Sequence, residues 1–306
     1  MDIVISFVDC KDKVWMKNYL SFIGLKENHH FRPKIDFFRF YNYDTIKYVF
    51  RGIDKFIPYV NNIFLVVSNI EQVPEYIDQS KIKVVLHKDF IPEQYLPLFN
   101  STAIEMFLHK IPGLDEEFVY FNDDTIPISP IPYDELFKNG LPCLNFVDNY
   151  MLPGNPTHRH VRLSFFEAKN TVEQLTGKSI NYNGNELCPT HTPHPMLKSI
   201  CEYGESVNRH LSLLDFYLTP FRSDRNLNQY YWCDILYFLK KYAPSNLKLK
   251  HIRTNEINEL INIDNQEYQY LCINDSKVRN QYVSEIYDII EKNMNKIFPD
   301  KCKYEK

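Results

Sequence analysis

Two adjacent carboxylates follow a strongly apolar stretch near the middle of the chain. Residues 117–121 read as a buried strand, and Asn122, Asp123 and Asp124 come where that strand should end. In open α/β sheets, ligands bind beyond the carboxyl ends of the strands. Adjacent carboxylates repel each other unless protons or a cation lie between them, so a divalent metal with a phosphate-bearing ligand would suit this position. The same residues also suit a turn, and taken alone the two interpretations stay open.

Other polar groups also follow apolar segments or open loops. They are Asp9 with Asp12, His191 with His194, Asn274 with Asp275, and the cationic stretch Arg222-Ser223-Asp224-Arg225. Carboxylates that hold a metal, with arginine and histidine nearby, suit a phosphoryl or nucleotide-sugar substrate. In such a site the arginine clamps phosphate oxygens, and a histidine or aspartate takes a hydroxyl proton. Each group also has a structural interpretation: Asp9 can close a turn or cap a helix, the histidines can be structural or bind zinc, and Arg222 can form a surface ion pair.

Several well-known nucleotide and hydrolase motifs are absent from the sequence. It contains neither the glycine-rich loop of P-loop kinases nor the glycine fingerprint of dinucleotide-binding enzymes, and it has only 8 glycines. It also lacks the G-x-S-x-G elbow that positions the serine of many hydrolases. These absences argue against a P-loop kinase, a standard dinucleotide enzyme and a serine hydrolase.

The elements that must position these residues alternate between strand and helix in the first part of the chain. Strands are predicted at residues 3–8, 63–67, 82–86, 117–121 and 268–273. Helices are predicted at residues 44–56, 101–109, 164–176, 195–205, 227–242 and 280–297, with Asp44 and Ser101 as caps. This order predicts an α/β fold with a Rossmann-like, mainly parallel sheet flanked by helices. Right-handed crossovers would bring Asp9 and the Asp123–Asp124 pair to one edge of that sheet.

We expect a single catalytic domain over residues 1–306, because no clear linker interrupts the chain. Residues 1–126 form the Rossmann-like half of this prediction. Residues 127–190 are a proline-marked, loop-rich insertion that would shape an acceptor site, and residues 191–306 are a helical half with one late strand.

Composition narrows the classes of function. The net charge of −4 gives no basic field, which argues against general nucleic-acid binding. The 7 cysteines are scattered and form no C-x-x-C pair, as expected in a reducing compartment. The N-terminal residues read as a strand and not as a signal peptide, and no apolar run is long enough to span a bilayer. We therefore expect a cytoplasmic protein, with peripheral attachment at the inner face of the membrane left open.

Four blocks of residues resemble those of a known family, the Stealth family of polysaccharide phosphotransferases. The most specific block begins near Arg39 and Tyr48-Val49-Phe50-Arg51. It continues through Leu96-Pro97-Leu98-Phe99-Asn100-Ser101, Ala103-Ile104-Glu105 and His109-Lys110-Ile111-Pro112-Gly113-Leu114 to Tyr120-Phe121-Asn122-Asp123-Asp124. The other blocks contain Asp2 to Asp9, then Ala168-Lys169-Asn170-Thr171, His191-Thr192-Pro193-His194-Pro195 and Phe221-Arg222-Ser223, and finally Cys272-Ile273-Asn274-Asp275. The chain departs from the family pattern at Cys10-Lys11-Asp12 and at Asp224-Arg225-Asn226, which leaves the roles of Asp224 and Arg225 undefined.

The resemblance implies transfer of a sugar 1-phosphate from a nucleotide sugar to a hydroxyl of an oligosaccharide or polysaccharide, free or lipid-linked. UDP is the nucleotide expected in the donor. The implied metal, Mg²⁺ or Mn²⁺, would be held by Asp124 and Asp275 with support from Asp123. His191 would be the general base, with Asp9 as second choice, and Arg222 would stabilise charge on the transferring phosphoryl group. Candidate substrate contacts are Arg51, Asn100, Asn122, Lys169, Asn170 and Asn274.

Two other functions stay open at this stage. A metal-dependent glycosyltransferase that makes plain glycosidic bonds would use a similar sheet and similar carboxylates. A non-catalytic glycan-binding protein would be consistent with the aromatic content of 15%. A binding protein would have little need for carboxylates, histidine and arginine at several separate strand ends and loops.

Overall fold

The chain forms two compact units, each assembled from three separate stretches of sequence. The computed structural model describes residues 1–26, 40–148, 159–208, 219–223, 226–263, 267–278 and 280–306. Unit 1 comprises residues 1–4, 87–120 and 133–246, and unit 2 comprises residues 5–86, 121–132 and 247–306. The interior of each unit therefore depends on segments that lie far apart in the sequence.

The largest sheet contains the four strands predicted in the first part of the chain. Its strand order is β10-β4-β1-β2-β3. These strands are β1 (Asp2–Ser6), β2 (Ile63–Val67), β3 (Lys83–Leu86), β4 (Glu117–Asn122) and β10 (His194–Leu197). β2 pairs with β3 in parallel, and every residue of β2 is buried, as expected for a strand covered on both faces. The predicted mixed α/β class is confirmed.

The strand β10 corrects a prediction. Residues 195–205 were expected to be helical, but Pro195 to Leu197 pair antiparallel with β4, and the helix α5 (Lys198–Asn208) begins only after them. A proline cannot donate to a strand ladder and is tolerated at a sheet edge, which is where β10 lies in the strand order. Residues 194–197 therefore form an edge strand, and the helix begins at Lys198 instead of Pro195.

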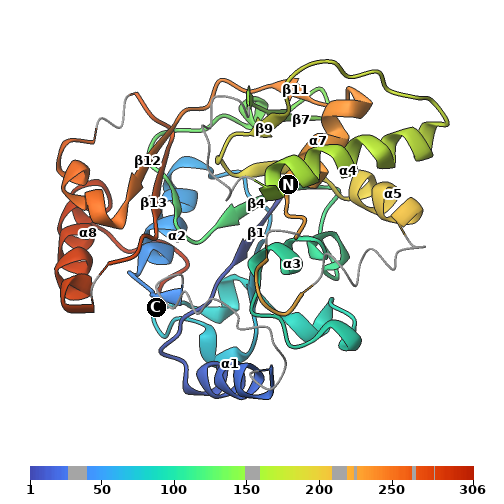
Figure 1. Ribbon diagram of the computed structural model, residues 1–306. Helices are drawn as coiled ribbons and strands as arrows, with labels where there is room; N and C mark the ends of the chain where they lie inside the picture. The colour runs from blue at the N-terminus through green and yellow to red at the C-terminus, as the bar shows by residue number, and fades with distance from the viewer. Residues whose placement is uncertain (27–39, 149–158, 209–218, 224–225, 264–266, 279) are drawn as a thin grey trace. The chain divides into compact units, whose positions relative to one another are not determined.

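In unit 1 the helices pack against one another beside short strands. Figure 1 shows α4 (Arg159–Thr176), α5 and α7 (Tyr230–Leu239) side by side. Gly204 of α5 permits this approach, because a Cβ there would lie 2.8 Å from Ile235 Cδ1 and 3.1 Å from Trp232. The remaining elements of unit 1 are η4 (His87–Asp89), η5 (Glu93–Tyr95), α3 (Ser101–Glu105), η6 (Leu108–Lys110), η7 (Tyr133–Glu135), β6 (Phe137–Lys138), β7 (Leu141–Leu144), β8 (Phe146–Asp148), β9 (Leu187–Pro189) and β11 (Ala243–Pro244).

Unit 2 contains a three-stranded sheet of order β12-β13-β5. Its strands are β5 (Thr125–Pro127), β12 (Leu249–Arg253) and β13 (Tyr270–Asn274), of which β12 is parallel and β5 antiparallel to β13. Its helices are α1 (Lys13–Lys26), α2 (Thr45–Phe56), η2 (Ile70–Gln72), η3 (Gln79–Lys81), η10 (Thr254–Asn262), η11 (Asn280–Tyr282) and α8 (Val283–Ile297). The late strand that was predicted at residues 268–273 is thus confirmed.

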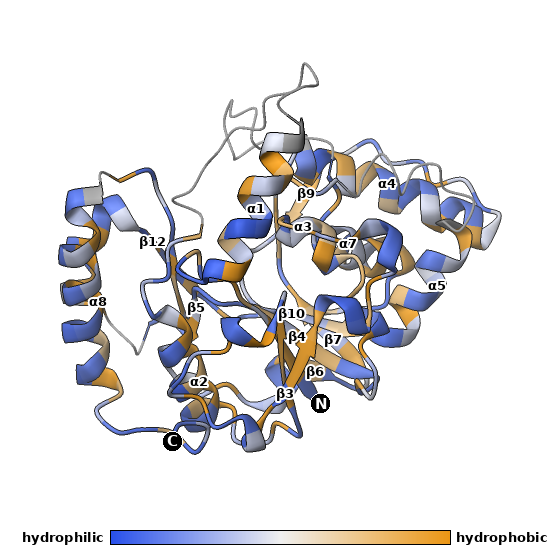
Figure 2. Ribbon diagram, turned by 90° about the horizontal axis from the view of Figure 1, so that it is seen from below, coloured by the Kyte–Doolittle hydropathy of each residue, from blue (hydrophilic) through white to orange (hydrophobic). Residues whose placement is uncertain are grey.

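The helices of unit 2 bury narrow apolar faces. In Figure 2, α8 mixes hydrophilic and hydrophobic residues along its length, and its buried Ile286, Ile290 and Met294 recur at helical spacing. On α2, Gly52 faces Pro127, and a Cβ there would come within 2.9 Å of Pro127 Cδ. The glycine therefore lets α2 lie directly against β5, the strand that follows Asp124. In the described part of the chain, no helix combines the length and the apolar character needed to cross a membrane.

Candidate functional site

In unit 2, Asp9 follows β1 and is held by several polar contacts. Its Oδ1 accepts a hydrogen bond from the Lys11 backbone N–H (2.8 Å), and its Oδ2 accepts one from Asn42 Nδ2 (2.9 Å). The side chain of Gln72 accepts from the Asp9 N–H at 2.6 Å and donates to the Asp9 carbonyl at 3.2 Å. These contacts fix the direction of a half-buried carboxylate at the end of a central strand.

Asp12 has a structural role three residues further on. Its Oδ1 accepts a hydrogen bond from the Val14 backbone N–H in the first turn of α1, and its Oδ2 accepts from Asn69 and Gln72 at 2.8 and 2.7 Å. Burial acts to raise the pKa of Asp12, but these hydrogen bonds outweigh it and keep the pKa below its ordinary value. Helix capping was one structural interpretation of Asp9, but the residue whose side chain caps α1 is Asp12.

Asp124 lies in the turn between β4 and β5 and contacts β13. Asp124 Oδ1 accepts a hydrogen bond from Thr125 Oγ1 (3.1 Å), and its Oδ2 lies 3.4 Å from Asn274 Nδ2. The Ile273 backbone N–H donates to the Asp124 carbonyl at 3.0 Å. The Asn-Asp-Asp stretch therefore forms a turn, as one interpretation predicted. The turn also places the Asp124 carboxylate next to the end of β13.

The two adjacent carboxylates of this turn influence each other. Burial and the neighbouring Asp124 carboxylate raise the pKa of Asp123 well above its ordinary value. Such a pair can bind a proton or a cation at neutral pH, because either one relieves the repulsion between the two charges. Asn122, the last residue of β4, is half-buried beside them.

Asp275 adds a third carboxylate to the same region of unit 2. Burial and the charge of Asp275 raise the pKa of Tyr43 to about 12. Burial, Asp9 and, to the smallest extent, Asp275 raise the pKa of the Cys10 thiol. Burial and Asp124 raise the pKa of Cys272, so this residue is a neutral thiol. The chain after β1, the turn after β4 and the end of β13 therefore come together. We call Asp9, Asp123, Asp124, Asn274 and Asp275 the carboxylate cluster.

In unit 1, His191 precedes β10 and contacts α7. Its Nδ1 lies 3.1 Å from the hydroxyl of Tyr230. His194, three residues later, is buried on β10, and its Nε2–H donates to the Thr190 carbonyl at 2.9 Å. Burial and the neighbouring His191 lower the pKa of His194 to about 3, so His194 is neutral and structural. His194 therefore has a structural role, whereas His191, the predicted base, contacts the Tyr230 hydroxyl.

Arg222 lies in the same part of unit 1. It is exposed at its position before α7, and its positive charge acts on two buried groups, Glu105 and Tyr230. Burial raises the pKa of Glu105, and a hydrogen bond from the Gln229 N–H (3.0 Å) and the charge of Arg222 oppose that rise. We call Glu105, His191, Arg222 and Tyr230 the Arg222 cluster. Glu105 and Tyr230 were not predicted as site residues.

A sequence signal for Glu105 did exist. It lies within the Ala103-Ile104-Glu105 stretch of the family resemblance, and a glutamate that is only 3% exposed needs polar partners. Those partners are Tyr120, whose hydroxyl donates to Oε1 at 3.3 Å, and the N-terminal end of α7. Tyr230 carried no comparable signal, because it lies in an aromatic run that reads simply as core.

Three of the residues predicted to contact the substrate form hydrogen bonds or ion pairs with other residues of the protein. Asn100 is 2% exposed and caps α3: its Oδ1 accepts from Thr102, and its Nδ2 donates to Asn226 and to the Thr219 carbonyl. The sequence pattern predicted Ser101 as the N-cap of this helix, but the N-cap is Asn100. On α4, Lys169 pairs with Glu173 at 2.9 Å, one helical turn away, whereas Asn170 is exposed.

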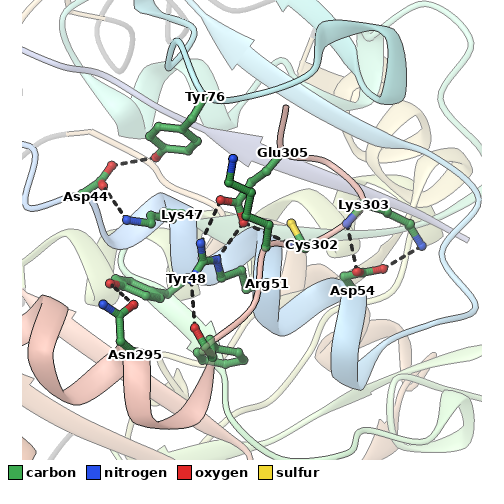
Figure 3. A network of polar contacts seen from close by, with 12 residues as sticks. Asp44, Lys47, Tyr48, Arg51, Asp54, Tyr76, Asn295, Cys302, Lys303 and Glu305 are labelled. Atoms are coloured by element: carbon green, nitrogen blue, oxygen red, sulfur yellow. Dashed lines mark hydrogen bonds and ion pairs between the residues drawn. The ribbon is translucent and has the colours of Figure 1, made fainter.

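The third of these residues is Arg51 on α2. Its Nε and Nη2 donate to the two carboxylate oxygens of Glu305 at 2.7 and 2.9 Å, and its Nη1 donates to the Phe298 carbonyl at 2.8 Å. Figure 3 shows this pair with Lys303, which contacts Asp54 at 3.0 Å. We call this network the Arg51 clamp. It attaches residues 298–306 to α2. Arg51, Asn100 and Lys169, which were predicted as substrate contacts, thus have partners within the chain. Asp224 and Arg225 lie outside the described residues.

The structure is of the mixed α/β class, with one cluster of carboxylates in unit 2 and the Arg222 cluster in unit 1. The family model described as Stealth protein CR2, conserved region 2, matches residues 39–143. The chain belongs to the Stealth family.

Its similarity to curated members of the family extends over the whole chain. Capsular polysaccharide phosphotransferase WcwK of Streptococcus pneumoniae is 30% identical over 338 aligned residues, which cover 100% of this chain and 99% of that protein. Capsular polysaccharide phosphotransferase fcs1 of Haemophilus influenzae is 30% identical and covers 92% of this chain and 80% of its own length. Exopolysaccharide phosphotransferase cps2G of Lactiplantibacillus plantarum is 28% identical over 100% of this chain and 96% of that protein.

Among solved structures, the chain shows a weak likeness to an active-site mutant of LgtC. The TM-score is 0.37 and the sequence identity 8%, over 95% of this chain and 96% of that chain.

Proposed function

We propose that this protein is a sugar-1-phosphate transferase that joins a sugar to a glycan hydroxyl through a phosphodiester, in the synthesis of a capsular or cell-wall polysaccharide. The donor is a nucleotide sugar, with UDP as the first nucleotide to test. The observation that carries the proposal is the similarity, over essentially the full length of both chains, to proteins named polysaccharide phosphotransferases. The residues that phosphoryl transfer would need are present in the two clusters described above.

The carboxylate cluster has the chemistry of a site for a hard divalent cation. Its donors are the oxygens of Asp124 and Asp275, with Asp123 and Asn274 beside them. Asp124 Oδ2 lies 3.4 Å from Asn274 Nδ2. Carboxylate and amide oxygens of this kind suit Mg²⁺ or Mn²⁺. When bound, the ion would neutralise charge on the phosphate oxygens of the donor.

The remaining roles fall to residues of the Arg222 cluster. In the proposed reaction, His191 takes the proton of the acceptor hydroxyl as its oxygen attacks the phosphorus attached to the donor sugar. A new phosphorus–oxygen bond forms, the pyrophosphate bond breaks, and the nucleoside monophosphate leaves. Arg222 stabilises the negative charge that develops on the transferring group. Asp9 stays the second candidate for the base, and Asn122 and Asn274 stay candidates for donor contacts.

Product analysis tests this proposal directly. Incubation of the protein with a panel of UDP-sugars and a glycan acceptor should release UMP and build phosphodiesters, which mass spectrometry detects. Release of UDP with a plain glycosidic product would instead identify the runner-up, a metal-dependent glycosyltransferase. Glycan binding without turnover of any nucleotide sugar would identify a binding protein.

The proposed metal site makes a separate prediction. Asp124→Asn should lower the transfer rate by about 10²-fold or more, because the ligand loses its charge while the turn keeps its shape. Chelation with EDTA should stop transfer, and addition of Mg²⁺ or Mn²⁺ should restore it. The matched control is Asp78→Asn, which changes a half-buried aspartate at the N-cap of η3 in the same unit. Full activity of Asp124→Asn in the presence of EDTA would contradict the assignment.

A further inference from the structure

Arg253 is the last residue of β12, and the strand register places it beside the carboxylate cluster of unit 2. Figure 1 shows β12 next to β13, and the two strands pair in parallel with Arg253 opposite Asn274. Neighbouring strands lie only about 4.7–4.9 Å apart, and directly opposite residues direct their side chains to the same face of a sheet. Asn274 Nδ2 in turn lies 3.4 Å from Asp124 Oδ2. Arg253 therefore lies on the face that carries a proposed metal ligand.

The preceding pair of residues in the same two strands agrees with this placement. Ile252 pairs with Ile273, and both are at most 1% exposed. Because side chains alternate between the two faces along a strand, Arg253 and Asn274 share the face opposite to this apolar pair. Both residues stand at the carboxyl ends of parallel strands, which is where ligands bind in open α/β sheets.

The chain that follows Arg253 is fixed to the chain that contains Asp275. Thr254 Oγ1 lies 2.8 Å from Ser276 Oγ and accepts a hydrogen bond from the Ser276 backbone N–H at 2.9 Å. The Asn255 backbone N–H donates to Ser276 Oγ at 3.0 Å. These bonds join the residue after Arg253 to the residue after Asp275, so the cation and the carboxylate are held at the same end of the sheet.

The guanidinium group of Arg253 is not used by the fold. The side chain is exposed, and within the part of the chain that the structure describes it forms no hydrogen bond and no ion pair. Lys250 on the same strand differs, because it pairs with Glu259 at 3.1 Å. The planar fork of donors of an arginine matches the oxygens of a phosphate group, and here that fork is available to a ligand.

The charges of a bound donor require such a group. The carboxylates of Asp124 and Asp275 are sufficient to neutralise a divalent cation, so the diphosphate of a nucleotide sugar would bring further negative charge without a counterion. We propose that Arg253 binds the diphosphate of the donor at the carboxylate cluster and is a further substrate-binding residue of this protein. This inference rests on the proposed function, which supplies the nucleotide sugar.

Equilibrium binding tests the inference without turnover. UDP in the presence of Mg²⁺ is the probe, and calorimetry gives its Kd. Arg253→Gln should weaken UDP binding by about tenfold or more, because a charge-assisted hydrogen bond to phosphate is lost. Arg253→Lys should recover part of the affinity, because it restores the charge without the fork of donors. The thermal midpoint of both variants should stay within about 2 °C of the wild type, since the side chain is exposed.

Lys248→Gln is the matched control for this experiment. Lys248 is also exposed and precedes β12, so the substitution removes one positive charge near the opposite end of the same strand. Its UDP affinity should stay within about twofold of the wild type, because an exposed charge at that distance is largely screened. Unchanged affinity of Arg253→Gln would overturn the inference. An equal loss in Lys248→Gln would show a general effect of net charge and would overturn it as well.

Product analysis separates this inference from the proposed function. If the wild-type protein releases UDP instead of UMP, phosphodiester synthesis is rejected, whereas weaker UDP binding by Arg253→Gln still supports the role of Arg253. If UMP is released, Arg253→Gln should raise KM for the donor about tenfold with a smaller change in kcat, because the contact is already made in the bound donor. Release of UMP with an unchanged KM in Arg253→Gln would leave the proposed function in place and reject this inference alone.

Discussion

Two arginines were predicted as site residues, Arg222 to stabilise charge on the phosphoryl group and Arg51 to contact the substrate, and the structure surrounds them differently. Arg51 on α2 is 8% exposed, and each of its three nitrogens donates within the Arg51 clamp. Arg222 is exposed and lies close enough to two buried groups, Glu105 and Tyr230, to lower the pKa that burial would give each of them. Hydrogen bonds from all three guanidinium nitrogens of Arg51 stabilise the fold, whereas the exposed guanidinium of Arg222 can be reached by an anion from solvent.

The largest expected effect comes from Arg222. Arg222→Ala should reduce the transfer rate by about 10³-fold, because an arginine that stabilises transition-state charge in phosphoryl transfer contributes at least that much. The thermal midpoint should stay within about 2 °C of the wild type, since the side chain is exposed. Steady-state kinetics and calorimetry measure the two quantities. Arg222→Lys should recover only part of the rate, because lysine lacks the planar fork of donors. Near-normal turnover of Arg222→Ala would remove the distinction between the two arginines.

Arg51 should show the reverse pattern. Arg51→Ala should lower the free energy of unfolding by about 3–5 kcal/mol, because it leaves the 3% exposed carboxylate of Glu305 without its partner. The transfer rate per folded molecule should not change. Denaturant titration gives the stability, and an active-site titration corrects the rate for the folded fraction.

The double variant Arg51→Met with Glu305→Leu is the control for the Arg51 prediction. It removes both charges together, so it should recover much of the lost stability. A stable Arg51→Ala protein with a large loss of transfer rate would contradict the structural role of the clamp.

The Arg51 clamp should also give stability a dependence on acidic pH. Burial of Glu305 acts to raise its pKa, but the hydrogen bond and charge of Arg51 outweigh this and hold the pKa below its ordinary value of 4.5. A carboxyl whose pKa is lower in the folded state adds stability above its unfolded pKa, and loses it as the pH falls through the folded value. Unfolding experiments from pH 6 down to pH 3 should therefore show that the wild-type protein loses stability below about pH 4.5. Glu305→Gln should lose less stability over this range, because it has no carboxyl group at this position. An identical pH dependence in both proteins would argue against the ion pair.

The smallest effect is expected for Lys169, a third cationic residue from the same set of predictions. Lys169 forms an ion pair with Glu173 at i,i+4 on the surface of α4. Lys169→Ala should change the free energy of unfolding by only about 0.3–0.5 kcal/mol and leave the transfer rate unaltered. The same two assays apply. A tenfold loss of rate would place Lys169 with Arg222 as a residue that contacts the substrate.

The strands of the largest sheet could be predicted well because their signals are local. β2 is an uninterrupted apolar run of five residues, and β4 is an apolar run that ends at Asn122. The helix start at Thr45 was also predicted, but Asp44 does not cap it with its side chain. It adopts the left-handed region (φ 61) and accepts a hydrogen bond from Tyr76 instead. The sequence pattern thus predicted where the helix begins. The partner of the Asp44 side chain, however, is Tyr76, which lies 32 residues away along the chain.

The sequence by itself determined the α/β class, the first four strands and the types of residue that phosphoryl transfer requires. These depend on short-range patterns of apolar and polar residues, and on a family resemblance that is carried by contiguous blocks. Only the tertiary structure decided that Arg51 and Asn100 are occupied by the fold, that His194 is buried, and that His191 faces Tyr230. The partner of a side chain can lie far away in the sequence, as Glu305 lies 254 residues from Arg51. The local pattern of apolar and polar residues around Arg51 therefore cannot predict that partner.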